Sequence, residues 1–292
     1  MTYGGIEAGG TKWVCAIGTG PDDVQESVVI PTGSPAETIA RATTFLAQNG
    51  SLAAVGVGSF GPIDLDPSSP TWGRITTTPK AGWNDVDLVS AIAIATRVPV
   101  GFDTDVNAAA LAEHRWGAAA GLDTFCYITV GTGIGGGGMA NGRLLHGLLH
   151  PEFGHMRIPH DRGRDPFPGN CPYHGDCLEG LASGQAVNAR WPGRAGRWDE
   201  EMLSLEAEYL ALGILNVISV LSPQRVILGG GVMNEPGLLD AVRRSVQELA
   251  GGYFQSPRLA DGIGDYIVAP SLGDRAGVLG AFELARSAAA QS

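Results

Sequence analysis

The stretch that decides the fold is Tyr3-Gly4-Gly5-Ile6-Glu7-Ala8-Gly9-Gly10-Thr11-Lys12-Trp13-Val14-Cys15-Ala16-Ile17-Gly18. Two short apolar runs joined by a glycine turn predict a β-hairpin. The turn glycines allow close backbone approach, and Thr11 and Lys12 offer a hydroxyl and a cation to a phosphate. The stretch is not a Walker A loop, because the residues that motif requires before its Gly-Lys pair are absent and a strand follows. An ordinary glycine hairpin is the other interpretation of this segment alone.

A second copy of this pattern occupies residues 125–142, where a strand leads into a glycine turn with Thr132 and then into further apolar residues. Gly131, Gly133 and Gly136 match the dinucleotide-binding fingerprint in spacing, but a run of glycines followed by Asn141-Gly142 cannot open a stable helix, so we reject that fingerprint. Each half then contains a strand that ends in glycine, at residues 53–62 and 225–232. The repeated order predicts a duplicated α/β unit.

Helices are predicted between these strands. Residues 34–46 combine a Ser34 cap, Pro35 at the first helical position and apolar residues with a period of about 3.6. The same period predicts a long helix over residues 201–221. Small residues in 276–282 predict a helix that packs closely on a neighbour.

Length and charge limit the classes of function. A chain of 292 residues exceeds a typical single core, so we expect two lobes with a cleft between them. A net charge of -11 without a basic stripe argues against a nucleic-acid partner. There is no charged leader before an apolar run and no stretch of about 18 apolar residues, so we expect a cytoplasmic protein with no membrane partner. Its thiols should be reduced, with Cys15 and Cys126 in the core.

The segment 150–180 gathers candidate metal ligands. Cys171, His174 and Cys177 lie close together in a Pro- and Gly-containing loop, a spacing that suits one tetrahedral ion. His155 is a candidate for the fourth ligand, and four protein ligands would make a closed, structural zinc site. Buried thiols with a surface histidine, or a disulfide between Cys171 and Cys177, are the alternatives, and the expected compartment makes the disulfide the weakest of the three.

Acidic residues also lie at a strand-to-helix junction, where α/β proteins gather ligands. Asp103 and Asp105 follow an apolar run and precede an alanine-rich stretch. One of the two is expected to be the N-cap of that helix, and the residues alone do not decide which. Asp105 is a candidate general base.

Together these motifs resemble the ROK (repressor, open reading frame, kinase) family of sugar kinases, and within it the bacterial zinc-containing fructokinases. The resemblance rests on residues 7–12, 105–108, 131–135, 152–155, 171–179 and 228–232. It implies an actin-like ATPase fold, a duplicated ribonuclease H-like α/β fold with two lobes and an active-site cleft between them. We expect a small α/β lobe over 1–117, completed by a C-terminal helix at 275–292, and a large α/β lobe over 118–274 with the zinc loop inserted at 150–180.

The resemblance also implies roles for individual residues. Asp105 would take the proton from a sugar hydroxyl, and Glu152, His155 and Glu179 would form hydrogen bonds with sugar hydroxyls. His155 would in addition ligate structural zinc together with Cys171, His174 and Cys177. Nucleotide binding would fall to Gly9, Gly10, Thr11, Lys12, Thr132 and Gly133 along the phosphates, Ala182 near the nucleotide, and Gly229, Gly230, Gly231, Val232 and Met233 beside the adenosine.

The activity implied is that of an ATP-dependent fructokinase, which uses magnesium with ATP and forms fructose 6-phosphate. A broader hexokinase acting on mannose or glucose, or a non-catalytic sugar-binding protein, are the alternatives, and a homodimer is common in the family. Thr104 stands where family glucokinases often have asparagine, which weakens a glucose assignment, and His174 favours the fructokinase branch. Glu7 replaces the usual aspartate, which leaves its contact with a magnesium-bound water open, and Lys80 is a candidate for the edge of the sugar pocket. The family's repressors carry a DNA-binding region before the first hairpin, so repression is not expected.

Overall fold

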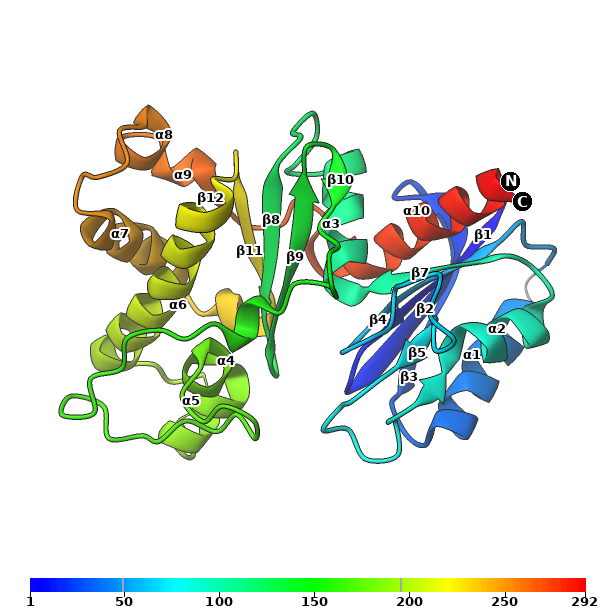
Figure 1. Ribbon diagram of the computed structural model, residues 1–292, viewed down its shortest axis with the longest axis horizontal. Helices are drawn as coiled ribbons and strands as arrows, with labels where there is room; N and C mark the ends of the chain where they lie inside the picture. The colour runs from blue at the N-terminus through cyan, green and yellow to red at the C-terminus, as the bar shows by residue number, and fades with distance from the viewer. Residues whose placement is uncertain (49, 195) are drawn as a thin grey trace. The chain divides into compact units, whose positions relative to one another are not determined.

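Two five-stranded mixed sheets, each in its own unit of the chain, form the framework of the computed structural model, which describes residues 1–48, 50–194 and 196–292. The first unit comprises Met1–Ala120, Leu145–His150 and Asp274–Ser292, and the second comprises Gly121–Leu144 and Pro151–Gly273. The short segment Leu145–His150 therefore belongs to the first unit, unlike in the division expected from the sequence. Figure 1 shows the course of the chain in colour.

The first unit is built on a sheet with the strand order β3-β2-β1-β4-β7. Strands β1, β2 and β3 form an antiparallel meander, and β4 and β7 add in parallel beside β1. The strands are β1 (Tyr3–Ala8), β2 (Lys12–Gly20), β3 (Asp23–Pro31), β4 (Val55–Ser59) and β7 (Val100–Thr104), with a separate small pair β5 (Arg74–Ile75) and β6 (Val86–Asp87). The helices are α1 (Pro35–Gln48), α2 (Leu88–Thr96), α3 (Asp105–Trp116) and α10 (Ala276–Gln291), preceded by the turn η3 (Gly273–Arg275).

A row of glycines crosses this sheet and receives the C-terminal helix. Gly5 on β1 pairs with Gly56 on β4, which pairs with Gly101 on β7. A Cβ atom on these glycines would lie 2.9 Å from the Val278 carbonyl oxygen, 1.8 Å from that of Ala281 and 2.2 Å from that of Leu284, all on α10. Because no side chains separate them, α10 lies directly on the backbone of three strands (Figure 1). The predicted close packing of residues 276–282 is confirmed.

The second unit repeats the arrangement with the order β10-β9-β8-β11-β12. Strands β8, β9 and β10 are antiparallel, and β11 and β12 add in parallel beside β8. The strands are β8 (Phe125–Val130), β9 (Ile134–Ala140), β10 (Arg143–Leu144), β11 (Val226–Gly229) and β12 (Ile267–Val268). The helices and 3-10 turns are η1 (Phe153–His155), α4 (Leu178–Ala182), α5 (Gly184–Arg190), α6 (Glu200–Leu221), η2 (Gly231–Asn234), α7 (Leu238–Ala250), α8 (Pro257–Ala260) and α9 (Ile263–Tyr266).

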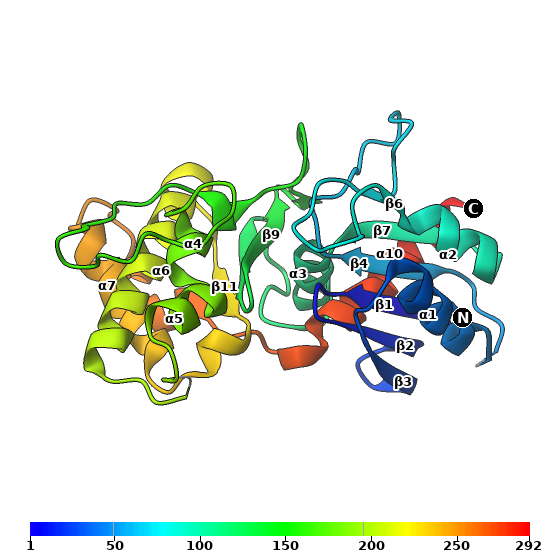
Figure 2. The ribbon, with the colours of Figure 1, turned by 90° about the horizontal axis from the view of Figure 1, so that it is seen from below.

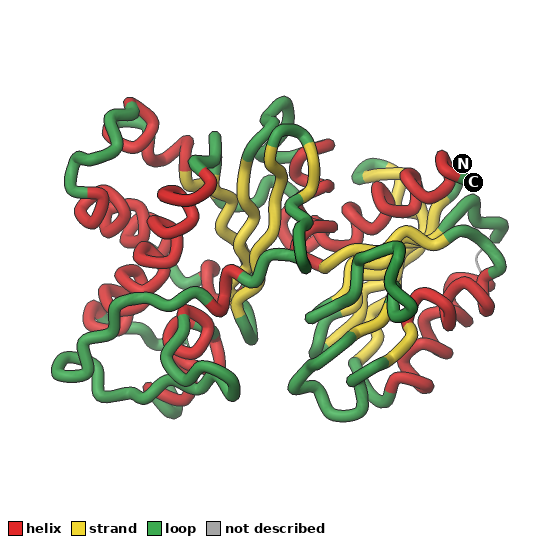
Figure 3. Tube along the Cα trace, viewed as in Figure 1, coloured by secondary structure: helices red, strands yellow, loops and turns green. Residues whose placement is uncertain are grey.

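The two sheets confirm the duplicated α/β unit predicted from the glycine hairpins. In each, the first hairpin is followed by a third antiparallel strand on one side and by parallel strands on the other. Strand β9 follows the glycine turn at 131–133, as the rejection of the dinucleotide fingerprint requires. The loop that follows β10 carries only one 3-10 turn before α4, which Figure 3 shows as a long irregular segment.

Helix α6 forms the centre of the second unit's core. It packs against α7 and α4 (Figure 2) and buries Leu210, Ile214 and Val217 among others. Its length and hydropathy would suffice to cross a membrane, but a buried core helix passes the same test. Cys126 lies in this core and Cys15 in that of the first unit; both are free thiols, as predicted.

Candidate active-site residues and metal centre

Asp105 begins helix α3, directly after the end of strand β7. The N-cap is Thr104, whose side chain accepts a hydrogen bond from the Asn107 amide at 3.1 Å. The expectation that Asp103 or Asp105 would cap the helix is therefore wrong: a hydroxyl between them takes that position. This frees both carboxylates for other contacts, and Oδ1 of Asp105 accepts from the Val106 amide at 2.9 Å.

The environment of Asp105 favours its protonated form. Burial raises its pKa to about 6, and the hydrogen bond from the Val106 amide only partly offsets that effect. The strand behind it has Gly58, where a Cβ atom would lie 3.3 Å from the Asp105 Cα atom and 2.7 Å from the Ala108 Cβ atom. The helix start is thus held tightly on β4, which fixes the position of the carboxylate.

Glu7 is a second buried carboxyl group in the first unit. Burial raises its pKa to about 7, and the nearby charge of Asp105 adds to this effect, while Lys12 opposes it. Its Oε2 atom is buried without a hydrogen-bond partner among the described residues. The extra methylene relative to aspartate is accommodated by Gly277 on α10, where a Cβ atom would lie 2.3 Å from the Glu7 Cδ atom.

Asp103 stabilises the junction between β7 and α3 through hydrogen bonds. Its Oδ1 atom accepts from the Thr104 amide and from the Asn107 side chain, both at 2.8 Å. Its Oδ2 atom lies 2.8 Å from Nε2 of His146, and this hydrogen bond raises the pKa of His146. His150, from the same short segment, accepts from the Ile63 amide at 3.1 Å. Two histidines therefore hold Leu145–His150 on the first unit, a role that the sequence analysis missed.

The first predicted phosphate turn lies in this unit as well. The Gly9 amide donates to the Lys12 carbonyl at 3.1 Å and closes the turn between β1 and β2. A Cβ atom on Gly10 would meet no atom within 4 Å, so the backbone there faces open space. Thr11 and Lys12 are exposed at the turn. The turn thus has the open backbone and the exposed cation that phosphate binding requires.

Several of the predicted nucleotide-binding residues of the second unit come together at the ends of β8 and β11. The Gly131 amide donates to the Gly133 carbonyl at 2.9 Å, and the Gly131 carbonyl accepts from the Gly184 amide at 2.8 Å. A Cβ atom on Gly184 would lie 3.4 Å from Val232, and one on Gly230 would lie 2.4 Å from the Val130 carbonyl oxygen. Gly184 was not predicted from the sequence, because its role depends on backbone approach between distant segments.

Glu179 joins the same turn. Its Oε2 atom accepts from the Ile134 amide at 2.9 Å, and a Cβ atom on Gly133 would lie 2.5 Å from that oxygen. Glu152 directly precedes the 3-10 turn η1. Within that turn the Gly154 backbone approaches β9 so closely that a Cβ atom on Gly154 would lie 2.0 Å from the Ile134 carbonyl oxygen. The segments carrying Glu152 and Glu179 are therefore both held on the start of β9.

The four predicted metal ligands gather in the second unit. Their ligand atoms all lie within 4.8 Å of one another. Nδ1 of His155 lies 3.3 Å from Nδ1 of His174 and 3.7 Å from each of the two cysteine sulfurs, and Nδ1 of His174 lies 3.6 Å from the Cys171 sulfur. Tetrahedral zinc with bonds of about 2.0–2.1 Å to nitrogen and about 2.3 Å to sulfur requires separations of about 3.3 Å and about 3.6 Å. The donor set therefore fits zinc in chemistry, and these four separations fit it in spacing.

The surroundings of His155 favour the neutral ring that binds a metal. Burial lowers the pKa of His155, which favours the neutral ring. Because Nδ1 faces the other three ligands, Nε2 of His155 lies on the opposite side of the ring, where a second partner can bind. The four cysteines of the chain are free, and the disulfide alternative for Cys171 and Cys177 is wrong.

The segment around Lys80 is not a simple surface loop. Trp83 is fully buried, packs on Trp13 with ring centroids 5.6 Å apart, and donates to the Gly33 carbonyl at 3.0 Å. The Lys80 amide donates to the Thr78 hydroxyl at 3.3 Å. The tryptophan therefore anchors the segment in the first unit's core, while Lys80 lies partly exposed beside it.

Comparisons with known proteins agree over the whole chain. The model of the ROK family matches residues 3–288. A fructokinase of Zymomonas mobilis is 44% identical over 98% of this chain and 97% of its own length, and one of Pediococcus pentosaceus is 40% identical over 99% of each. A crystal structure of a ROK family glucokinase from Streptomyces griseus, in complex with glucose and AMPPNP, is 25% identical, covers 98% of this chain and 100% of that one, and superposes with a TM-score of 0.79. The family model matches almost every residue, and the structure has the duplicated sheets and glycine turns predicted from the sequence. The chain therefore belongs to the ROK family and has its actin-like ATPase fold.

Proposed function

We propose that this protein is an ATP-dependent fructokinase that forms fructose 6-phosphate. The observation that carries the catalytic part is Asp105, a carboxylate fixed at the start of α3 whose pKa is raised to about 6. A general base with a pKa near the working pH is well matched to take a proton from a hydroxyl group. The choice of fructose rests on the relatives at 44% and 40% identity that are fructokinases.

The reaction is in-line phosphoryl transfer. A fructose hydroxyl oxygen forms a bond to the γ-phosphorus, the bond from that phosphorus to the β,γ-bridging oxygen breaks, and ADP leaves. Oδ2 of Asp105 accepts the hydroxyl proton, while Oδ1 stays bound to the Val106 amide and fixes the orientation. Glu152, Glu179 and Nε2 of His155 bind sugar hydroxyls.

The glycine turns bind ATP. Gly9, Gly10, Thr11 and Lys12 contribute backbone amides, a hydroxyl and a cation to the phosphates, and Thr132 and Gly133 contribute a second turn. Ala182 would contact the nucleotide, and the adenosine would bind beside Gly229, Gly230, Gly231, Val232 and Met233. Magnesium bound with ATP would neutralise charge on the phosphates. Glu7 is close enough to Lys12 for their charges to interact.

The test of activity measures ADP release with fructose, mannose, glucose and no sugar, and identifies the phosphorylated position by nuclear magnetic resonance. We expect the highest kcat/KM with fructose and phosphorylation of O6. Asp105→Asn should lower kcat about 100-fold or more, because the proton loses its acceptor. Asp22→Asn, the same chemical change at an exposed site, is the matched control. ADP release that does not depend on any sugar would refute the kinase assignment, and a higher kcat/KM with glucose or mannose would refute fructose as the substrate.

We propose that His155, Cys171, His174 and Cys177 hold one structural zinc ion. The match of their separations to tetrahedral zinc supports this. Purified protein should contain about one zinc per chain, and the double change Cys171→Ser and Cys177→Ser should abolish it. Full metal content after both changes would exclude this ligand set.

We also infer a cytoplasmic homodimer, an expectation that rests on the family. Light scattering coupled to size-exclusion chromatography measures the mass in solution directly. A mass near the chain's 30.2 kDa would contradict the dimer.

A further inference from the structure

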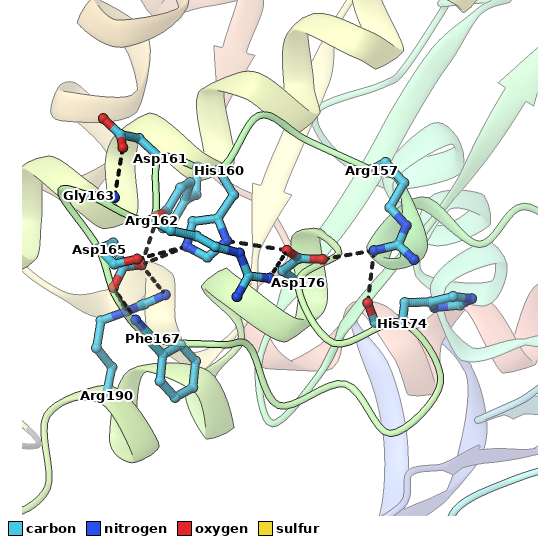
Figure 4. A network of polar contacts seen from close by, with 11 residues as sticks. Arg157, His160, Asp161, Arg162, Gly163, Asp165, Phe167, His174, Asp176 and Arg190 are labelled. Atoms are coloured by element: carbon cyan, nitrogen blue, oxygen red, sulfur yellow. Dashed lines mark hydrogen bonds and ion pairs between the residues drawn. The ribbon is translucent and has the colours of Figure 1, made fainter.

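A chain of polar contacts runs from the proposed zinc loop into the core of the second unit (Figure 4). It begins at Asp176, which lies between the ligands His174 and Cys177 in the sequence. Its Oδ1 atom accepts from Arg157 at 2.8 Å and its Oδ2 atom accepts from Arg162 at 2.7 Å. The same Arg157 nitrogen donates to the His174 carbonyl at 2.8 Å. One arginine therefore links a carboxylate to the backbone of a ligand residue.

His160 carries the contacts inward. Its ring is buried, with Nδ1 lying 3.3 Å from Oδ2 of Asp176 and Nε2 lying 3.0 Å from the Asp165 carbonyl oxygen. The ring therefore lies between the Asp176 carboxylate and the backbone carbonyl of Asp165. One side chain, that of His160, thereby connects the parts of the loop that carry Asp176 and Asp165.

Asp165 is the residue at which this series of polar contacts reaches the core. It is buried and accepts from the Phe167 amide at 3.1 Å, from the Tyr209 hydroxyl at 2.8 Å and from Nε of Arg190 at 3.2 Å. The Arg190 guanidinium lies over the rings of Phe167, Trp191 and Tyr209 at 4.6, 5.0 and 5.5 Å. Arg190 belongs to α5 and Tyr209 to α6, so two helices of the core hold this end.

We propose that Asp176 is a positioning residue for the metal centre, which it holds in a ligating geometry by fixing the turn from Cys171 to Cys177 to the core through His160 and Asp165. The inference rests on the proposed zinc site. Partners of metal ligands orient those ligands, and loss of such a partner typically weakens metal binding about 10- to 100-fold. Arg157 holds the His174 backbone directly, while Arg162 and His160 act through the Asp176 side chain, which lies between two ligands in the sequence.

The test compares zinc affinity in the full-length protein by competition with a coloured chelator. Asp176→Asn should weaken zinc binding about 10- to 100-fold, because a neutral amide has one acceptor oxygen and cannot pair with both Arg157 and Arg162 as the carboxylate does. Asp161→Asn is the matched control, since it removes the same charge from the same loop. Asp161 is exposed, and its side chain accepts from the local Gly163 amide. Its affinity should stay within about twofold of the original.

Cobalt replacement separates positioning from a general loss of stability. The visible absorption bands of cobalt(II) report the geometry of the ligands, so Asp176→Asn should change these bands while Asp161→Asn leaves them unchanged. Arg162→Gln is a second variant, because Arg162 is exposed and its removal leaves no buried charge; it should weaken zinc binding several-fold even if Asp176→Asn does not fold.

The outcomes distinguish the two proposals. Unchanged affinity and an unchanged cobalt spectrum in Asp176→Asn would overturn the positioning role while leaving the zinc site intact, and so would unchanged affinity in Arg162→Gln if Asp176→Asn does not fold. No zinc binding by the original protein would overturn both. Fructose kinase activity without any bound metal would leave the catalytic assignment untouched.

Discussion

At the scale of single residues, the feature with the largest chemical consequence is the burial of Asp105. Burial makes the carboxylate a better proton acceptor, because water stabilises its charge less. The same burial makes its ionised form costly to the folded protein. Burial of Asp105 therefore raises its basicity and lowers the stability of the folded protein at neutral pH, a combination that is common at functional carboxylates.

The activity should reflect this pKa. Only ionised Asp105 can accept a proton, so kcat/KM should fall about tenfold per pH unit below about pH 6 and level off above it. The measurement is kcat/KM for fructose from pH 5 to pH 9, with zinc content monitored at each pH. A fall that begins near pH 4, the range of an ordinary aspartate, would contradict the raised pKa.

Stability should change in the opposite direction. The folded carboxyl group binds its proton more tightly than the unfolded one, so its contribution to stability is present below about pH 4 and is lost as pH rises to about 6. Asp105→Asn lacks this loss. At pH 8 the variant should have a free energy of unfolding roughly 1 to 3 kcal/mol higher than the original, and the gain should shrink at pH 4.5. Urea unfolding at both pH values measures it, and a variant that is less stable at pH 8 would refute the burial cost.

At the scale of elements, the glycine row of Gly5, Gly56 and Gly101 determines how α10 packs on the first sheet. A side chain at any of them must push the helix away, since the atoms in contact are backbone carbonyls that cannot rotate aside. The register that aligns these glycines is therefore as important to this unit as its apolar core.

Gly56→Ala should consequently destabilise the protein by about 3 kcal/mol or more, because its Cβ atom would lie 1.8 Å from the Ala281 carbonyl oxygen. Gly264→Ala is the control: it lies in α9 and a Cβ there would meet nothing within 4 Å. Thermal unfolding of both variants is the measurement. Equal melting temperatures for the two would show that the helix can move without cost.

The elements themselves could be predicted to different degrees from the sequence. The hairpins and α1 and α6 follow from glycine turns, a cap and apolar spacing, which are local signals. The gathering of His155 with Cys171, His174 and Cys177 follows from the chemistry of these residue types. The contacts of His160 and Asp165 could not be predicted, because polar residues in an irregular loop have no period. The raised pKa of Asp105 depends on burial, which no motif reveals.

At the scale of the whole molecule, the last helix packs on a sheet whose first strand begins near the N-terminus. Helix α10 packs on β1, β4 and β7, so the first unit needs both ends of the chain. Loss of α10 would expose the glycine row and the apolar residues that pack on it.

Removal of residues 274–292 should therefore abolish cooperative thermal unfolding of the first unit, because the sheet loses the helix that covers one face. Removal of only Gln291 and Ser292, which are exposed, should leave the melting temperature unchanged. Circular dichroism during heating compares the two. A folded, active protein without α10 would show that this helix is dispensable.

The segment Leu145–His150, held by His146 and His150, belongs to the first unit although the residues on both sides of it belong to the second. The polypeptide therefore passes from one unit to the other at four points along its length. Neither unit corresponds to one continuous piece of the gene. An exchange of a unit between two relatives by recombination would need matched joints at all four crossings, so such relatives are expected to diverge by substitution more readily than by shuffling.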